Sequence, residues 1–208
     1  MSQLNTLLEK ADKQREVLLS ISKEQKFFIY KQLLLSNQNE PYTLACERIL
    51  SLAKEESLSI TEELLQELHS ILTTDSNHYR LVKRIEKKSG YQSPLPEDLP
   101  HIMHHLADQY SSSKTTLHPI ELSAMMYKRI LDIQPFMEIE ANQTIAFLIM
   151  NLILLHYGYT PAIILEDQKE VHDKTLMESR IHYDMEPFCI FIANTLLRSL
   201  NDMIKELS

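Results

Sequence analysis

The chain has 208 residues, 44% of them hydrophobic, and a formal net charge of -8. This length suits one domain, or one core with an appended subregion, that is stable without a disulfide or a metal. The negative charge argues against general binding to nucleic acids or to anionic membranes. Only two glycines are present, Gly90 and Gly158, which excludes a glycine-rich phosphate loop and a dinucleotide-binding fold.

The two cysteines indicate a reducing compartment. Cys46 and Cys189 lie far apart and lack metal-ligand spacing, so we expect no disulfide framework. The first residues alternate apolar and charged positions and hold no continuous apolar run, and no secretory signal is visible. We therefore expect a cytoplasmic protein.

Helical spacing of apolar residues dominates residues 1–74. This spacing predicts helices near residues 4–11, 27–34, 42–54 and 62–72. Pro41 stops or restarts a helix, and Ser59 followed by Glu62 has the spacing of a capping box. We expect these N-terminal helices to form one compact unit with residues 75–208.

Residues 75–100 interrupt the helical pattern with Gly90 and three prolines. The segment HYRLVKRIEKKSGY, residues 78–91, predicts a short β-hairpin. It carries a basic cluster in an acidic chain, formed by Arg80, Lys83, Arg84, Lys87 and Lys88. A solvated charge run is the common outcome for such a cluster, and contact with an acidic partner or an anion is the alternative.

Helical patterns return after residue 100, near residues 101–110 and 119–133, and from Pro187 onward. Residues 145–155 are apolar at every position except Asn151, which predicts a buried central helix too short to span a bilayer. Gly158 is placed to end that helix. The sequence therefore predicts an all-α domain.

Three histidines at the start of the helix near residues 101–110 have metal-ligand spacing. His101, His104 and His105 stand at i, i+3 and i+4, so their rings could share one face and bind Zn²⁺ or Ni²⁺. No fourth ligand is evident, and a solvated or packed helix face is the more common outcome. His118, before Pro119, is interpreted as a helix-entry residue.

The stretches LHPIELSAMMYKRILDIQPF and LIMNLILLHYGYTPAII resemble the Fic (Fic/Doc, Fido) family. Most characterised members transfer AMP from ATP to protein hydroxyls. The resemblance extends over roughly residues 4–200. It implies a Fic-type helical bundle around one buried central helix, with a short β-hairpin flap and a core formed by residues 75–208.

The family signature, HPFxxGNGRxxR, is poorly preserved. Its positions are held here by Gln134, Pro135, Phe136, Ala141, Asn142, Gln143, Thr144 and Phe147. Two more residues separate Phe136 from Ala141 than in the family's loop. Gln134 replaces the histidine that the family uses as a general base, and an amide cannot take a hydroxyl proton. Asn142 is retained and could contact phosphate or cap the buried helix.

The glycines and arginines of the signature, which would bind phosphate in the family, are also absent here. The glycines would let backbone amides approach phosphate oxygens, and the arginines, replaced by Thr144 and Phe147, would neutralise them. Glu138 or Glu140 could supply a carboxylate for Mg²⁺, but a metal without the anion-binding groups is weakly held. We expect no cofactor, with ATP and Mg²⁺ relevant only if residual family activity remains.

A second family pattern, [S/T]xxxE[G/N], marks an inhibitory helix whose glutamate pairs with the second signature arginine. Residues 36–40 match it from Ser36 to Glu40, with Pro41 in the last position. The expected partner position is Phe147, which cannot form an ion pair. This resemblance therefore implies that the inhibitory segment is a relic.

The leading hypothesis is a bacterial-type pseudoenzyme that binds a partner protein, or a second copy of itself, through the former target groove and the basic flap. The first rival is a transferase with an altered phosphate donor, using Gln134, Glu138 and Glu140. The second rival is a metal-binding protein built on the three histidines.

Overall fold

Nine α-helices and two short 3₁₀-helices occur in the part of the chain that the computed structural model describes, residues 2–35, 39–73, 78–86 and 90–207. The α-helices are α1 (Gln3–Leu19), α2 (Lys23–Leu34), α3 (Glu40–Leu52), α4 (Glu62–Thr73), α5 (Leu99–Ser113), α6 (Pro119–Ile133), α7 (Ile139–His156), α8 (Lys169–His182) and α9 (Glu186–Leu207). The 3₁₀-helices are Pro96–Asp98 and Glu166–Gln168. Within those described ranges there is no strand, which confirms the all-α prediction.

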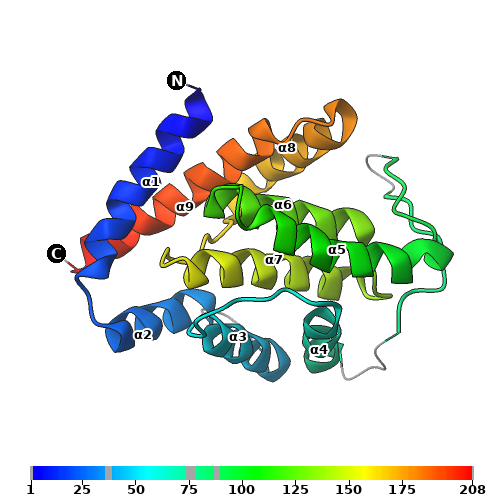
Figure 1. The fold of residues 1–208 in the computed structure, drawn as a ribbon, viewed down its shortest axis with the longest axis horizontal. Coiled ribbons are helices and arrows are strands. Elements are labelled where there is room, and N and C mark those ends of the chain that lie inside the picture. Colours follow the sequence, from blue (N-terminus) through cyan, green and yellow to red (C-terminus); the bar gives the residue numbers. More distant parts are fainter. Residues whose placement is uncertain (1, 36–38, 74–77, 87–89, 208) are drawn as a thin grey trace.

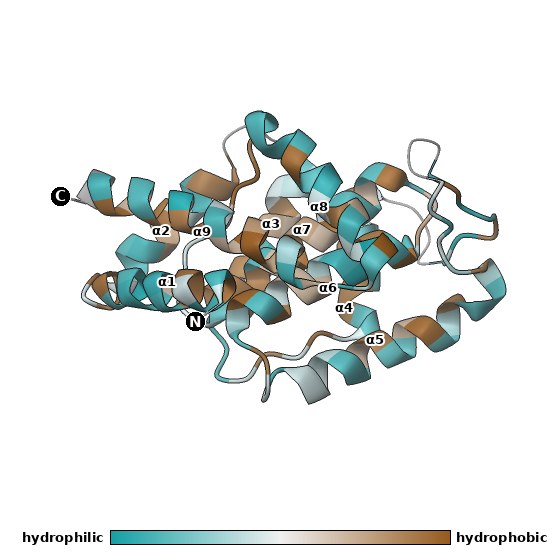
Figure 2. Cartoon of the chain, turned by 90° about the horizontal axis from the view of Figure 1, so that it is seen from above, coloured by the Kyte–Doolittle hydropathy of each residue, from teal (hydrophilic) through white to brown (hydrophobic). Residues whose placement is uncertain are grey.

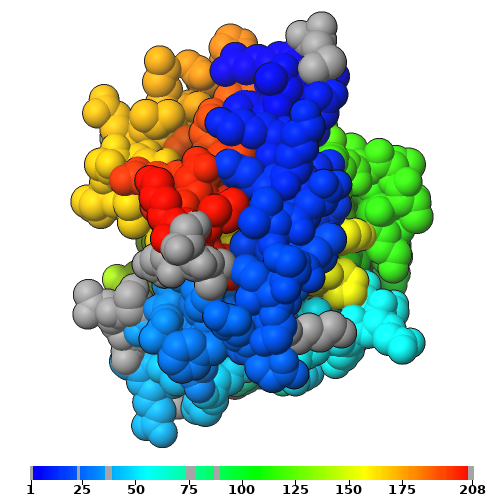
Figure 3. Space-filling model, turned by 90° about the vertical axis from the view of Figure 1, so that its left-hand side faces the viewer, coloured from blue at the N-terminus to red at the C-terminus, as the bar shows by residue number. Residues whose placement is uncertain are grey.

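Helix α7 lies at the centre of the bundle, with α6 on one side and α3 and α4 on the other (Figure 1). Helix α9 packs against α6, α8 and α1. Figure 3 shows α1 lying across one face of the molecule with the end of α9 beside it. The N-terminal helices α1, α3 and α4 thus pack directly on the helices of the C-terminal part.

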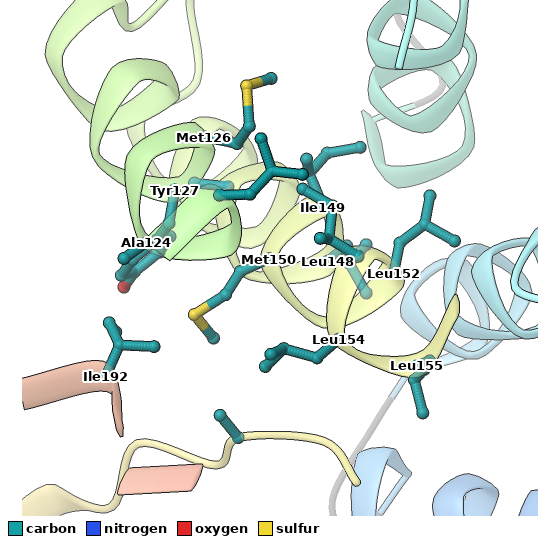
Figure 4. Packing of buried hydrophobic residues seen from close by; sticks show 14 of the residues in the cluster. Ala124, Met126, Tyr127, Leu148, Ile149, Met150, Leu152, Leu154, Leu155 and Ile192 are labelled. Carbon is teal, nitrogen blue, oxygen red and sulfur yellow. The ribbon is translucent and has the colours of Figure 1, made fainter. Parts of the chain in front are cut away.

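The central position of α7 follows from its apolar sequence. Of its 18 residues, 67% are buried, and Leu148, Ile149 and Leu152, which Figure 4 shows projecting from the helix, are fully buried. Helix α7 is long and apolar enough to cross a membrane by length and composition, but the core helix of a soluble protein passes the same test. It begins six residues before the predicted start at Ile145. Its length therefore does not exclude a membrane span, and its burial identifies it as the core helix of the bundle.

The one polar residue within the predicted buried run has its hydrogen bonds satisfied. Asn151 Oδ1 accepts from the Ala162 amide at 2.8 Å, and Asn151 Nδ2 donates to the Phe147 carbonyl at 3.1 Å. These bonds tie the chain that follows α7 to the middle of the helix. A buried amide paired in this way is tolerated in the core.

Several helix ends form as predicted. Gly158 adopts a φ of +86°, and the Tyr159 and Gly158 amides donate to the Leu154 and Leu155 carbonyls in a Schellman arrangement. His118 caps α6, since its Nδ1 accepts from the Ile120 amide. The predicted cap of α4 is wrong, because the hydroxyl of Thr61, not Ser59, accepts from the first turn, at the Leu64 amide.

Helix α8 was not predicted. Its apolar residues are too few to give a helical stripe, and only Leu176 and Ser179 are buried. It forms because its narrow inner face packs on α9. Figure 2 shows the contrast between such outer helices, where hydrophilic residues predominate or alternate with hydrophobic ones, and the central α7.

The predicted β-hairpin is not present in the described part of residues 78–91. A single antiparallel bridge joins Ile85 to Gln92. Beside it, the Glu86 amide donates to the Tyr91 carbonyl at 2.9 Å and the Ser93 amide donates to the Arg84 carbonyl at 3.1 Å. The carbonyls of Val82 and Pro94 accept hydrogen bonds from the Arg80 guanidinium at 2.7 and 2.6 Å. We therefore call residues 79–86 the flap segment without assigning a strand to it.

Both cysteines are buried, and burial raises the pKa of the Cys46 thiol to about 11 and that of Cys189 to about 12. We expect neither thiol to react with iodoacetamide at pH 8 in the folded protein, because the reactive thiolate is scarce and shielded. Both should react once the protein is unfolded in guanidinium chloride. Mass spectrometry after timed alkylation would measure this, and rapid labelling of the native protein would contradict it.

Candidate functional site

Gln134, at the position that the family resemblance gives to the general base, ends α6 in a left-handed backbone conformation with φ 46° and ψ 63°. This conformation is uncommon for residues other than glycine, asparagine, aspartate and histidine. The Gln134 amide donates to the Ile130 carbonyl at 2.9 Å. Its side-chain Oε1 is buried and has no hydrogen-bond partner within the described residues. Gln134 therefore presents an amide, with no titratable group, at this position.

Arg80 holds the chain around Gln134. Its side chain is fully buried and donates to the Gln134 carbonyl at 2.7 Å and to the Ile133 carbonyl at 3.2 Å, while its backbone amide donates to Pro135 at 2.8 Å. A cation at the carboxyl end of α6 is favoured by the helix dipole. Burial, followed by the charge of Arg84, lowers the pKa of Arg80, yet a guanidinium remains protonated in proteins. Its interpretation as a solvated or partner-binding flap residue is corrected.

The carboxamide of Asn142 is occupied by the backbone of its own loop. Its Oδ1 accepts from the Phe136 amide at 3.0 Å, and its Nδ2 donates to the Phe136 and Glu138 carbonyls at 2.9 and 2.8 Å. Asn142 is buried and lies one turn inside α7, whose N-cap is Glu138. The capping role considered for Asn142 is therefore wrong, and the residue instead fixes the loop from Phe136 to Glu138.

Glu138 binds a histidine from α4. Its Oε2 lies 2.8 Å from His69 Nε2, and the buried His69 ring stacks on Phe136 with centroids 4.0 Å apart. The hydrogen bond from His69 lowers the pKa of Glu138. Glu140, in the first turn of α7, is exposed. The two carboxylates considered for Mg²⁺ thus lie at the start of α7, where the helix dipole would otherwise favour a bound anion.

Replacing Glu138 with glutamine should destabilise the protein by less than about 1 kcal/mol at pH 7, because the carboxylate is 37% exposed and solvent screens its interaction with His69. Since the folded-state pKa is lowered, the contribution of Glu138 is complete above the ordinary glutamate pKa. It is lost as the pH falls through the folded-state value. Urea unfolding of both proteins at pH 7 and pH 3.5 would measure this. A difference that grows in acid would contradict the prediction.

A cavity of about 230 Å³ lies beside Gln134, between α6, the start of α7 and α8. Its wall includes a chain of polar groups, in which Tyr127 Oη lies 3.1 Å from His172 Nε2 and His172 Nδ1 lies 3.1 Å from Asp173 Oδ1. Burial lowers the pKa of His172, against the effect of its bond to Asp173. The imidazole is therefore neutral near pH 7.

The principal cation of the cavity wall is already neutralised. Arg180 is almost fully buried and pairs with Asp132 at 2.7 Å and with Glu86 at 2.8 Å, and its guanidinium lies over the Tyr91 ring. Lys128 also binds Asp132, at 2.5 Å. Lys169, the other basic residue of the wall, is 65% exposed and lies 3.7 Å from Glu166. The cavity has polar walls but offers no cluster of unpaired cations among the described residues.

These groups do not fit ATP and Mg²⁺. The two arginine positions hold Thr144 and Phe147, the retained Asn142 is used internally, and Glu138 faces His69. Nothing in this arrangement supplies forked donors for phosphate oxygens. We therefore derive no catalytic step through a nucleotide.

The surface next to the loop combines exposed apolar and basic groups from two segments. Leu81 and Ile85 of the flap segment are 88% and 56% exposed, and Met137 and Ile139 are 48% and 49% exposed. Arg84 joins the two segments by donating to the Met137 carbonyl at 2.6 Å. Lys83 is exposed, as predicted. We refer to Leu81, Ile85, Met137 and Ile139 as the flap patch.

The remaining candidate residues lie elsewhere. Glu40 is exposed in the first turn of α3, and Ser36 lies outside the described residues, so the inhibitory relic stays a prediction.

The three histidines of α5 do not share one point. His101 and His105 approach each other, whereas His104 lies 3.9 Å from Asp108. No group of three or more histidine, cysteine or acidic side chains arranged for a metal was found among the described residues. The proposed three-histidine set does not converge.

Sequence reasoning missed His69, Asp132, His172 and Arg180. Each lies on a helix whose residue pattern gave little reason to single it out. Each contributes to the site through contact with a side chain that is distant in the sequence. Asp132, next to the final residue of α6, was the one visible signal, as a charge on a helix that is otherwise mostly buried.

Comparison with solved structures defines the class of fold. The chain aligns with a Fic domain containing signaling protein from Bacteroides thetaiotaomicron with a TM-score of 0.81 and 21% identity, covering 94% of this chain and 95% of that one. It aligns with Fic-1 from C. elegans with a TM-score of 0.77 and 16% identity, covering 98% of this chain and 72% of that one. The bundle is a Fic-domain fold.

Sequence comparison then gives the family. The model of the Fic/DOC family matches residues 59–154, a range that includes α4 and the whole α6–α7 loop. Proteins called protein adenylyltransferase Fic are 32% identical over 114 residues in Nematostella vectensis and 33% identical over 116 residues in Drosophila willistoni. Each match covers 54% of this chain, and it spans 26% and 22% of the two relatives, about a quarter of their length. Residues 59–154 are thus similar in sequence to the Fic/DOC family, and the rest of the chain shares its fold.

Proposed function

We propose that this protein has lost nucleotidyl transfer and acts by binding a partner protein through the flap patch. The observation that carries the proposal is the use of Asn142. The only polar side chain retained from the signature loop makes three hydrogen bonds to its own backbone and is 1% exposed. It has no donor left to offer to a phosphate.

The charge around the loop supports the same conclusion. Glu138 and Glu140 place two carboxylates at the start of α7, and a triphosphate there would meet like charge. Gln134 cannot draw a proton from an attacking hydroxyl. Loss of the base and of both phosphate-binding arginines removes several kcal/mol of transition-state stabilisation, at about 1.4 kcal/mol for each tenfold change in rate.

The relatives support binding to a protein. A structurally similar Fic domain, IbpAFic2, is known covalently tethered to Cdc42, and the chain aligns with it at a TM-score of 0.55. In our chain the flap patch exposes Leu81 and Ile85 beside the basic Lys83. Exposed apolar side chains flanked by charge are typical of protein contact surfaces. We propose a protein partner of mixed apolar and acidic character, and we propose no nucleic acid, membrane or cofactor.

The activity test uses ATP, GTP, CTP or UTP with Mg²⁺. We expect no mass increment on the protein itself or on proteins of a lysate, and no thermal shift with any nucleotide, since a ligand held by the folded state would raise its apparent stability. The Gln134→His variant should also be inactive, because Thr144 and Phe147 still replace the arginines. Histidine tolerates the left-handed backbone of position 134 better than most residues, so this variant should fold.

The altered-donor transferase is the competing proposal, and one result would establish it. A modification by wild-type protein that disappears in the Glu138→Gln/Glu140→Gln double variant would overturn the loss of transfer. The bond between Glu138 and His69 argues against this outcome, because it directs one of the two carboxylates toward α4.

The binding test compares two charged substitutions. Proteins crosslinked to wild-type chain in a lysate of its own host should be lost with Leu81→Asp/Ile85→Asp. They should be retained with Leu19→Asp, which changes a residue 61% exposed at the end of α1. Equal loss in both variants would refute the flap patch as the binding surface. Sedimentation of the purified protein would show whether a second copy is the partner.

A further inference from the structure

A pair of histidines on the exposed face of α5 lies outside the proposed binding surface. His101 and His105 are both exposed and stand one helical turn apart. Their Nε2 atoms lie 3.1 Å from each other, and the two rings meet edge to face with centroids 4.3 Å apart. The same ring nitrogen of the two imidazoles is thus brought together on one side of the helix.

The spacing of the two nitrogens matches that of adjacent ligands on one metal ion. Zinc binds imidazole nitrogen at about 2.0–2.1 Å, so ligands at angles between octahedral and tetrahedral values lie about 2.9–3.4 Å apart. The observed 3.1 Å falls within that range. We propose that His101 and His105 bind one divalent transition-metal ion through Nε2.

The neighbouring residues limit this site to two protein ligands. His104 is 74% exposed, its Nε2 lies 3.9 Å from Asp108 Oδ2, and its ring centroid is 6.3 Å from that of His105. His104 therefore faces a different part of the helix surface. The remaining coordination positions point to solvent and are filled by water, so the ion is exchangeable.

The ligand chemistry selects the class of metal. Neutral imidazole suits Zn²⁺, Ni²⁺ and Cu²⁺, whereas Mg²⁺ and Ca²⁺ require oxygen ligands, which neither histidine provides. A neutral imidazole carries its one hydrogen on either ring nitrogen, so coordination through both Nε2 atoms requires that both rings carry that hydrogen on Nδ1. The site joins two turns of α5 and is independent of the proposed loss of nucleotidyl transfer.

The test titrates the full chain with ZnCl₂ in an isothermal calorimeter, with MgCl₂ as the ion that should not bind. We expect a Zn²⁺ site that weakens about tenfold or more in either His101→Ala or His105→Ala, because the second ligand acts at high effective concentration. His104→Ala, on the same exposed helix turn, is the matched control and should bind like wild type.

Two outcomes would overturn the proposal. One is the absence of Zn²⁺ binding at millimolar metal in wild type. The other is a loss in His104→Ala as large as in His101→Ala, which would indicate unspecific histidine binding. Electron paramagnetic resonance with one equivalent of Cu²⁺ provides an independent readout. Hyperfine coupling should show two nitrogen ligands in wild type and in His104→Ala, and a changed pattern in His105→Ala.

Discussion

Replacing Arg80 with methionine should lower the free energy of unfolding by about 3–5 kcal/mol. The guanidinium is fully buried and donates to the carbonyls of Val82, Pro94, Ile133 and Gln134. Methionine has a similar length but no donor, so these carbonyls would lose their charge-assisted partner inside the protein. Chemical denaturation monitored by far-ultraviolet circular dichroism would measure the change.

The matched control is Lys83→Met, three positions along the flap segment and exposed to solvent. Its effect should lie within about 0.5 kcal/mol. Arg80→Lys should recover only part of the loss, because one ammonium cannot reproduce the flat fork that reaches several carbonyls. Equal stability of Arg80→Met and Lys83→Met would show that Arg80 does not hold the loop.

Replacing Leu152 with alanine should cost about 3–5 kcal/mol. Leu152 is fully buried on α7, and its side chain points toward a neighbouring helix (Figure 4). Truncation would remove three carbons from the centre of the bundle, where α7 is enclosed on several sides and cannot shift to fill the cavity. Guanidinium titration should show a lower midpoint.

Ile139→Ala provides the comparison within the same helix. Ile139 is the first residue of α7 and is 49% exposed, so its truncation should cost less than about 1 kcal/mol. A loss at Leu152 no larger than the loss at Ile139 would mean that α7 is not the centre of the packed core.

Most of the bundle could be predicted because its helices carry an apolar face that is visible in local spacing. Residues 119–133 form α6 as expected, and Gly158 ends α7 with the left-handed backbone that only its lack of a Cβ makes inexpensive. Helix α8 escaped prediction because its stability comes from contact with α9 and not from its own pattern. The expected hairpin is reduced, in the described residues, to one bridge between Ile85 and Gln92 with two flanking backbone hydrogen bonds, and the Val82 carbonyl beyond it binds the Arg80 guanidinium.

The sequence predicted which signature side chains the candidate site lacks. It did not predict the hydrogen bonds that the residues of the loop make instead. The exchange of histidine for Gln134 can be seen in the sequence. The bonds of Asn142 to Phe136 and of Glu138 to His69 cannot, since each depends on how the α6–α7 loop folds back on itself or on α4. For the same reason the basic cluster separated into a buried Arg80 and an exposed Lys83, although both have the same charge in the sequence.

Compared with the family signature, this chain has two additional residues between Phe136 and Ala141. They make the loss of the phosphate-binding loop difficult to reverse. An α-helix turns by about 100° for each residue, so removing two residues from the start of α7 would rotate everything before the cut by about 200° relative to Asn142. Phe136 would then face away from the carboxamide that now holds it. Point substitutions that reinstate a histidine and two arginines would leave this offset in place, and a deletion alone would break the internal bonds. Recovery of a phosphate-binding loop would therefore need the deletion and the substitutions at the same time, and neither is useful without the other.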